Sequence, residues 1–248
     1  MGDEALTRDI FLGGKLAIWQ PREGYRAATD PVLLAAAVPA LSGQSVLELG
    51  CGAGVALLAL GRRVPGLALH GVERQESYAA LARRNAGENS LRAEVAVADL
   101  TGLPAPLRIG FDHVMANPPY YRPGSPAARD AGRAQALREE TPLSDWIAAG
   151  LKRVKPDGYL TMIHLADRLP DILCALWGKA GLVVRPIAAR QGREAGRVLV
   201  QARKGRKSPF RLLAPLVMHE GESHLGDRDD FSLSARAVLR DGAALDWS

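Results

Sequence analysis

The sequence predicts an α/β protein with a doubly wound, mainly parallel sheet of seven strands and helices on both faces. Three observations support this fold. Short apolar runs typical of buried strands alternate with longer runs that have helical spacing, and this alternation predicts parallel strands joined by crossover helices. The last two apolar runs are instead joined by the short turn "QGREAG", which predicts a hairpin and one antiparallel strand near the C-terminus. The 248 residues, 47 % of them hydrophobic, suffice for one such domain.

The predicted strands are apolar runs bounded by glycine, proline or polar residues. The first stops at a glycine, and the fifth follows a Pro-Asp-Gly turn. Pro186 interrupts the sixth run, so we expect that strand at an edge of the sheet or at a bulge. In chain order the runs are "SVLELG", "LALHGVE", "RAEVAVAD", "FDHVMAN", "DGYLTMIHL", "LVVRPIAAR" and "GRVLVQARK".

Four segments between these strands have helical spacing. The second is expected to end at Gly87 or Asn89, and Ser144 or Thr141 is the expected N-terminal cap of the third. Trp146 and Trp177 lie on the last two predicted helices, where we expect them in the core. The segments are "AGVALLALGRRV", "QESYAALARRNAGEN", "PLSDWIAAGLKRV" and "RLPDILCALWGKAGL".

We divide the chain into three parts: an N-terminal segment (1–40), the α/β domain (41–207) and a C-terminal extension (208–248). The extension contains a possible short strand and short helix and is expected to pack on the same domain. No secretory leader, myristoylation pattern or bilayer-length apolar run is visible, so a cytoplasmic protein is expected.

Charge and cysteine content restrict the function classes. The net charge of +5 and the isoelectric point of about 9.5 weakly favour a polyanionic partner. The two cysteines, Cys51 and Cys174, imply no disulfide framework. The five histidines lack zinc-ligand spacing with a cysteine, and we therefore expect no metal site.

A glycine-rich loop, "LELGCGAG", lies between the first strand and the first helix. Gly50, Gly52 and Gly54 allow a sharp turn and close approach of a ligand. The third glycine comes one residue earlier than in the dinucleotide fingerprint, and Glu48 stands inside the strand. The pattern E-x-G-x-G-x-G resembles the first motif of the S-adenosylmethionine-dependent methyltransferases. A carboxylate near this loop, which also contains Cys51, suits a cofactor with a sulfonium cation and an amino group.

Acidic residues follow the next two strands. Glu73 ends the second strand about 20 residues beyond the loop, where an acid binds ribose hydroxyls in nucleotide-binding α/β folds, and its neighbour Arg74 is included in the expected site. Asp99 ends the third strand and can accept a hydrogen bond from an adenine amino group. The adjacent Leu100 is expected to line the adenine ring.

The stretch "NPPY", Asn117 to Tyr120, follows the fourth strand at the sheet edge where ligands bind. It resembles the catalytic motif of the amino-methyltransferases that act on adenine, cytosine or glutamine amide nitrogen. The Asn117 side-chain oxygen and the Pro118 carbonyl can both accept N–H bonds from a planar amine, and Pro119 helps to fix the backbone. Tyr120 can stack on the flat substrate. No covalent intermediate is expected.

The N-terminal stretch "FLGGKLAIWQPREGYRAATDPVLLAAAV" is similar to the bacterial tRNA1(Val) adenine-N6 methyltransferases. This resemblance, which extends from about residue 11 to 204, implies a Rossmann-like fold, S-adenosylmethionine as cofactor and tRNA as substrate. It also implies that segment 1–40 covers the cofactor site. Carried over residue by residue, Tyr25, Arg26, Thr29 and Asp30 would face the methionine end of the cofactor.

Two groups of basic residues could follow an RNA backbone. The first group follows the NPPY motif, and the second lies on the last predicted hairpin and just after it. The alternative interpretation is that these are solvated surface residues that form salt bridges. The residues chosen as nucleic-acid contacts are Arg122, Arg129, Arg133, Arg138, Arg193, Arg197 and Lys204.

Other functions share parts of these motifs. Release-factor glutamine methyltransferases also contain NPPY, but they typically have a helical N-terminal domain, whereas only about forty residues precede the glycine loop here. DNA or a small molecule could also be the acceptor, and a binding module that had lost its chemistry would keep the fold. The glycine spacing disfavours a nicotinamide oxidoreductase.

Overall fold

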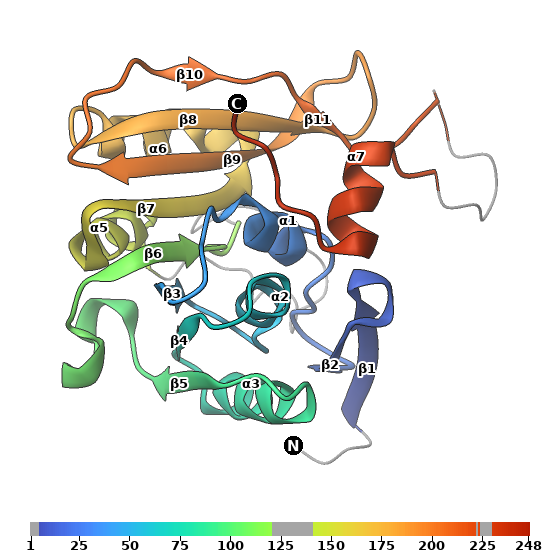
Figure 1. Ribbon diagram of the computed structural model, residues 1–248, viewed down its shortest axis with the longest axis vertical. Helices are drawn as coiled ribbons and strands as arrows, with labels where there is room; N and C mark the ends of the chain where they lie inside the picture. The colour runs from blue at the N-terminus through green and yellow to red at the C-terminus, as the bar shows by residue number, and fades with distance from the viewer. Residues whose placement is uncertain (1–4, 121–140, 222, 224–229) are drawn as a thin grey trace.

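The computed structural model describes residues 5–120, 141–221, 223 and 230–248, and a nine-stranded sheet is its central feature. The strand order is β10-β8-β9-β7-β6-β3-β4-β5, and β11 also pairs with β8. Figure 1 shows this order from β10 at the top to β5 at the bottom. The predicted α/β class is therefore confirmed.

Seven of these strands correspond to the predicted runs. From β5 to β7 the neighbouring strands are parallel, and β9 runs antiparallel to both β7 and β8. The hairpin expected from "QGREAG" is thus confirmed. The strands are β3 (Ser45–Leu49), β4 (Ala68–Glu73), β5 (Ala93–Val97), β6 (Phe111–Ala116), β7 (Val154–Leu165), β8 (Ala180–Ala188) and β9 (Ala195–Lys204).

The prediction of seven strands was two short, because the C-terminal extension adds β10 (Arg211–Leu212) and β11 (Leu216–Val217) beside β8. Pro186 explains why they are separate. β10 pairs up to Val184 of β8, and β11 starts to pair only at Ile187. Pro186 lies in the gap, beside a register shift in the β8–β9 pairing. Pro186, which has no N–H, therefore lies one residue before the register shift and close to a bulge, one of the two positions expected for it.

Helices cover both faces of the sheet and bury two hydrophobic clusters. One cluster includes residues of the first three helices and of α7, and the other includes residues of α5 and α6. Neighbouring sheet residues alternate between the clusters: Val114 belongs to one and Met115 to the other. The helices are α1 (Asp30–Ala37), α2 (Val55–Arg63), α3 (Glu76–Glu88), α5 (Leu143–Arg153), α6 (Leu169–Leu176) and α7 (Leu233–Arg236).

Local predictions for the helices have mixed outcomes. Asn89 ends α3 as expected. Neither Ser144 nor Thr141 caps α5; Pro142 occupies the cap position, where its fixed φ suits a helix start. Trp177 is 65 % exposed instead of lying in the core, because α6 ends at Leu176 and leaves Trp177 beyond its buried face.

The N-terminal segment forms a separate antiparallel hairpin, β1 (Leu6–Phe11) and β2 (Leu16–Pro21), which the sequence analysis did not predict. Asparagine side chains of α3 satisfy the outer edge of β2. Asn85 Oδ1 accepts from the Trp19 amide at 2.8 Å, and Asn85 Nδ2 donates to the carbonyls of Trp19 (3.1 Å) and Ala53 (2.9 Å). Asn89 makes the same two-way contact with Ala17. These amides take the place of a third strand and attach the hairpin to the domain.

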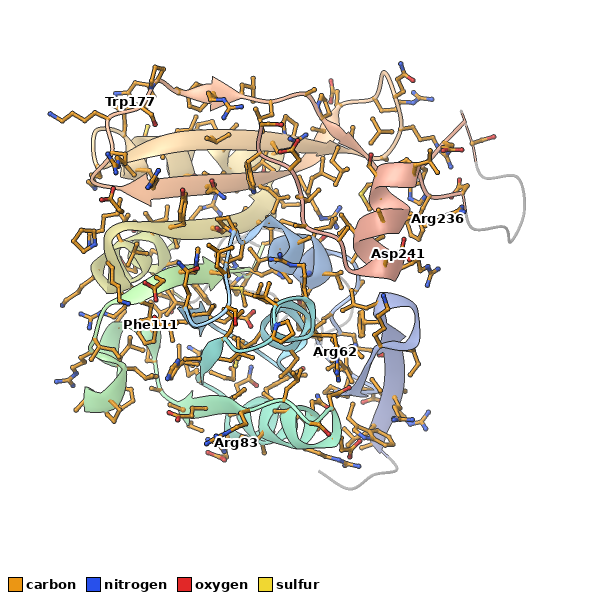
Figure 2. The ribbon with its side chains drawn as sticks, in the orientation of Figure 1. Arg62, Arg83, Phe111, Trp177, Arg236 and Asp241 are labelled. Atoms are coloured by element: carbon orange, nitrogen blue, oxygen red, sulfur yellow. The ribbon has the colours of Figure 1, made fainter. Side chains whose placement is uncertain are left out.

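The C-terminal extension contacts α1 and the hairpin. The Trp247 indole N–H donates to the Ala37 carbonyl at 2.9 Å. Lys15 Nζ donates to the Asp241 carbonyl at 2.9 Å, and Figure 2 labels Asp241 at the end of the last helical segment that lies nearest to the hairpin. The C-terminal extension therefore contacts both α1 and the N-terminal hairpin. Across the part of the chain that the structure describes, every helix is too short or too polar to traverse a bilayer.

The Asn85 contacts generate the first prediction. Asn85→Ala leaves buried backbone groups of β2 and of the glycine loop without partners, so the free energy of unfolding should fall by about 3 kcal/mol. Gly87→Ala on the same helix is the control, because Gly87 is exposed and an added Cβ meets nothing within 4 Å; it should raise stability by about 0.5–1 kcal/mol. Urea denaturation followed by circular dichroism measures both. Unchanged stability in Asn85→Ala would contradict the role assigned to this side chain.

Candidate active site

The glycine loop and the NPPY motif meet where the strand order reverses. From β3 the chain continues to β4 and β5 on one side and then returns to β6 on the other side of β3. The last paired residues of β3 and β6 are Leu49 and Ala116. Gly50 and Asn117 come next in each strand, at the carboxyl edge where ligands bind in open α/β sheets. Two motifs about 65 residues apart in the chain are thereby brought side by side.

The glycine loop requires conformations that other residues rarely adopt. Gly50, Gly52 and Gly54 have φ angles of +65°, +53° and +87°. At Gly50 a Cβ would also lie 2.5 Å from Cη2 of Trp146, whereas at Gly52 it would meet nothing within 4 Å. Gly54 ends the loop as the N-terminal cap residue of α2. The loop is thus shaped by its backbone, with Trp146 packed closely against one side.

Two adjoining cavities open above the strand ends, and they share Tyr25, Gly50, Gly52, Tyr78 and Asn117. We call them the main cavity and the side cavity. The remaining residues of the main cavity are Val72, Glu73, Arg74, Gln75, Ala98, Asp99, Leu100, Pro118, Pro119, Tyr120, Thr141 and Trp146. Those of the side cavity are Gln20, Ala27, Pro31, Glu48, Cys51, Ala53, Val55 and Ala56.

Glu48 lies in the wall of the side cavity and is 3 % exposed. Its Oε2 accepts the Leu57 N–H of the first turn of α2 at 2.9 Å, where the helix dipole favours negative charge. Burial raises the pKa of this carboxyl well above its usual value, against the effect of the Leu57 hydrogen bond. A buried acid is therefore held beside the glycine loop. A cation bound in the side cavity would stabilise the charged form of this carboxyl.

Glu73 and Asp99 line the main cavity near the ends of β4 and β5, and their contacts with a cofactor stay a prediction. Glu73 accepts the backbone N–H of Gly52 at 3.0 Å and that of Gln75 at 2.9 Å. Asp99 accepts both the hydroxyl and the backbone N–H of Thr101, at 2.6 and 2.8 Å, and these bonds lower its pKa. Both carboxylates are fixed by local turns and present hydrogen-bond acceptors to a ligand.

Two NPPY side chains belong to a hydrogen-bonded chain beside the cavities: Asn117, which lines both, and Tyr120, which lines the main cavity. Asn117 Nδ2 donates to the Tyr25 hydroxyl at 3.4 Å, and the Tyr120 hydroxyl lies 3.0 Å from Asn117 Oδ1 and 2.7 Å from Asp30 Oδ2. Arg197 Nε donates to the same Asp30 oxygen at 2.6 Å. Burial raises the pKa of both tyrosines, with the Asp30 charge contributing, so both phenols keep their protons.

Several residues of the cavity wall were not identified from the sequence. Trp146 was expected in the core; it is buried, but one side of it lines the main cavity, and its indole N–H has no hydrogen-bond partner among the described residues. Gln20, Tyr78 and Thr141 also line the cavities. These residues belong to segments outside the motifs, and no local sequence pattern marks them.

Four predicted cofactor residues, Gly54 among them, lie outside both cavity walls. Arg26 pairs with Asp9 at 2.8 Å, and Thr29 precedes α1 as its N-terminal cap residue. Asp30 accepts a hydrogen bond from the Tyr120 hydroxyl and is separated from the cavities by that side chain. Their contact with the methionine end of a cofactor stays a prediction, as does that of Gly54, which the structure uses to start α2.

The predicted nucleic-acid residues are only partly described. Arg122, Arg129, Arg133 and Arg138 lie outside the described residues. In the second group, Lys204 Nζ donates to the carbonyls of Leu151 and Val154 at 2.7 Å each. Arg197 is bound to Asp30, and Arg193 is exposed in the β8–β9 turn. Within the described ranges no cluster of three or more His, Cys, Asp or Glu side chains could hold a metal ion.

Comparisons with known proteins show which proteins the chain resembles. The family model described as methyltransferase small domain matches residues 28–140. A tRNA1(Val) (adenine(37)-N6)-methyltransferase of Porphyromonas gingivalis is 34 % identical over 177 residues, which cover 67 % of this chain and 69 % of the relative. A protein of the same name from Dickeya chrysanthemi is 30 % identical over 249 residues, which cover 96 % and 95 %.

Solved structures share the fold. A predicted O-methyltransferase from Agrobacterium tumefaciens has a TM-score of 0.71 and 29 % sequence identity, covering 87 % of this chain and 98 % of that one. A Thermus thermophilus 16S rRNA N2 G1207 methyltransferase, solved with AdoMet and guanosine, has a TM-score of 0.57 at 18 % identity, covering 80 % and 50 %. The latter similarity concerns the fold alone.

The contact between Gly50 and Trp146 generates the second prediction. Gly50→Ala combines a left-handed backbone with a steric clash, whereas Gly52→Ala has only the backbone strain, because its Cβ would meet open space. Gly52→Ala should lose about 1 kcal/mol of stability, and Gly50→Ala should lose about 1–3 kcal/mol more. Urea denaturation of both variants, with Trp fluorescence reporting the environment of the tryptophans, measures this difference. Equal losses would show that Trp146 does not pack against this loop as the structure places it.

Proposed function

The chain belongs to the methyltransferase family that includes the tRNA1(Val) (adenine(37)-N6)-methyltransferases, and we propose that it transfers a methyl group from S-adenosylmethionine to the exocyclic amine of an adenine in tRNA. One observation carries this proposal: Gly50 and Asn117 directly follow a pair of residues in register on adjacent strands. A methyl donor held over the glycine loop and an amine held at Asn117 are therefore within reach of each other.

The two cavities fit the proposed cofactor. Adenosine combines a ribose with a flat apolar ring, and the main cavity offers Glu73 for hydroxyls and Asp99 for an amino group, with Leu100 and Trp146 as apolar walls. The buried indole N–H of Trp146 has no hydrogen-bond partner among the described residues. The side cavity contains Glu48, whose buried carboxyl suits a cationic ligand. When bound, the cofactor would supply the electrophilic methyl group.

The NPPY residues supply positioning. The lone pair of an adenine amine is delocalised into the ring, so the nitrogen is a weak nucleophile. Asn117 Oδ1 and the Pro118 carbonyl can each accept one of its N–H bonds, and Pro119 restricts the backbone so that the carbonyl is held before the substrate arrives. Tyr120 provides a flat surface for the ring. The methylated nitrogen then loses its proton, so no general base is needed before the transfer, and most of the acceleration comes from orientation.

The choice of tRNA rests on relatives and on charge. The names of the relatives specify a tRNA adenine, and the net charge of +5 favours a polyanion. The exposed Arg193 of the β8–β9 turn is a candidate for a phosphate contact, because no described contact occupies it. Arg197 and Lys204 have partners within the chain, so their proposed contribution to RNA binding would require those partners to be exchanged.

The third prediction concerns the catalytic side chains. Asn117→Ala and Tyr120→Ala remove an acceptor and the stacking surface, and each should lower methyl transfer to bulk tRNA by about 10²-fold or more. Binding of S-adenosylmethionine, measured by calorimetry, should persist, because the Gly loop, Glu73 and Asp99 are unchanged. Undiminished turnover in both variants would end the proposal.

The acceptor class is tested in the same assay. Labelled methyl transfer is compared between bulk tRNA, DNA and purified release factor, with nuclease treatment as the control. Label that is sensitive to ribonuclease and recovered as N6-methyladenosine by nucleoside mass spectrometry is the expected result. Label on the release factor would instead assign the enzyme to glutamine methylation.

A further inference from the structure

The Tyr120 hydroxyl has two acceptors and one hydrogen. It lies 2.7 Å from Asp30 Oδ2 and 3.0 Å from Asn117 Oδ1, both within hydrogen-bond distance. A phenol carries a single hydrogen, and carboxylate and amide oxygens cannot donate. Only one of the two oxygens can therefore receive the hydrogen at any time, and the choice decides whether the lone pairs of Asn117 face a donor.

The geometry favours Asp30 as the acceptor. Its distance is the shorter one, and a hydrogen bond to a carboxylate is about twice as strong as one to a neutral amide oxygen. The carboxylate is held in place, because its side chain is only 13 % exposed and the same Oδ2 accepts Arg197 Nε at 2.6 Å. Asp30 also begins α1, where the helix dipole stabilises negative charge.

The other side of the amide is fixed as well. Asn117 Nδ2 donates to the Tyr25 hydroxyl at 3.4 Å, which leaves Oδ1 on the side of Tyr120; Asn117 also lines the main cavity. With the Tyr120 hydrogen directed to Asp30, Oδ1 has no donor among these neighbours and remains open to an incoming N–H. With the hydrogen directed to Oδ1, a substrate amine would have to compete with Tyr120.

We propose that Asp30 is a positioning residue that draws the Tyr120 hydrogen away from Asn117 and thereby keeps Asn117 Oδ1 available to the substrate amine. This inference rests on the proposed amine methylation. It assigns to Asp30 a role in substrate positioning in place of the predicted cofactor contact. Asp30 acts through the Tyr120 hydroxyl, which contacts both Asp30 Oδ2 and Asn117 Oδ1. A purely structural role is the competing explanation, because the Asp30–Arg197 pair also joins α1 to β9.

A double-mutant cycle separates the two explanations. The wild type, Asp30→Asn, Tyr120→Phe and the double variant are compared by kcat at saturating S-adenosylmethionine and saturating acceptor. Asp30→Asn keeps the size of the side chain but weakens the acceptor, so kcat should fall about tenfold. Tyr120→Phe removes the hydrogen in question, so in that background Asp30→Asn should change kcat by less than about twofold. An equal loss in both backgrounds would overturn the inference.

Two further measurements make the outcome specific. The affinity for S-adenosylmethionine should be unchanged in Asp30→Asn; a loss of affinity that accounts for the whole effect would return Asp30 to the cofactor site and refute the inference. Asp157→Asn is the matched control: it neutralises a surface aspartate paired with Arg206 at 2.5 Å, away from the cavities, and should leave kcat unchanged.

The design tolerates two complications. If Asp30→Asn does not fold, Asp30→Ser takes its place, because serine is accepted at helix starts and offers only a neutral acceptor. The acceptor is whichever class takes the methyl group in the preceding assay. A different substrate class would therefore revise the proposed function, while the coupling between Asp30 and Tyr120 would still be decided by the cycle.

Discussion

The in-register pairing of β3 with β6 is the constraint on which the rest of the site depends. Because Leu49 pairs with Ala116, the two strands end together, and Gly50 and Asn117 leave the sheet as neighbours. The reversal of strand order at this position leaves space above the strand ends that no crossover helix fills. A shift of one residue in this pairing would turn every side chain of β6 to the opposite face. Val114 and Met115 are packed into separate hydrophobic clusters, so such a shift would disrupt the packing on both faces of the sheet.

The second requirement is a wall on the open side of that space, and the ends of the chain provide it. Among the described residues the β1–β2 hairpin has no strand partner in the main sheet, and the side chains of Asn85 in α3 and of Asn89 at its C-terminal end bind its edge. The segment that follows contributes Tyr25 to both cavities and leads into α1. The C-terminal extension then covers α1 through the Trp247 indole. Site geometry is thus linked to contacts far from the chemistry, which is why a short hairpin and a tail have a part in building the pocket.

The sequence allowed prediction of those features that local backbone chemistry determines. Gly50 and Pro118 mark positions where a sharp turn or a rigid acceptor is needed, and the acids at strand ends follow from strand positions alone. Features that depend on contacts distant in the chain were missed. Trp146 is an ordinary helical aromatic until α5 packs against Gly50. Asp30 was named through the family resemblance as a cofactor residue, but its contacts with Tyr120 and Arg197 depend on β6 and β9 and were not predicted. The hairpin was missed because its edge is satisfied by side chains of α3, which leave no strand-pairing pattern in the sequence.

Charge and hydrogen-bond direction together explain how Tyr25 and Tyr120 can serve the site without exchanging a proton. Burial raises the pKa values of Tyr25 and Tyr120, so neither serves as a base, and both remain hydrogen-bond donors of fixed number. A weak amine nucleophile is helped most by acceptors that already point at its N–H bonds, because those acceptors need no reorganisation when the substrate arrives. For positioning the amine, the number of hydrogen-bond donors and acceptors around Asn117 then matters more than the pKa values of the neighbouring side chains. In the proposed arrangement, the Asp30 carboxylate accepts the Tyr120 hydrogen before any ligand binds. The Asn117 oxygen is then already oriented as a free acceptor for the substrate amine.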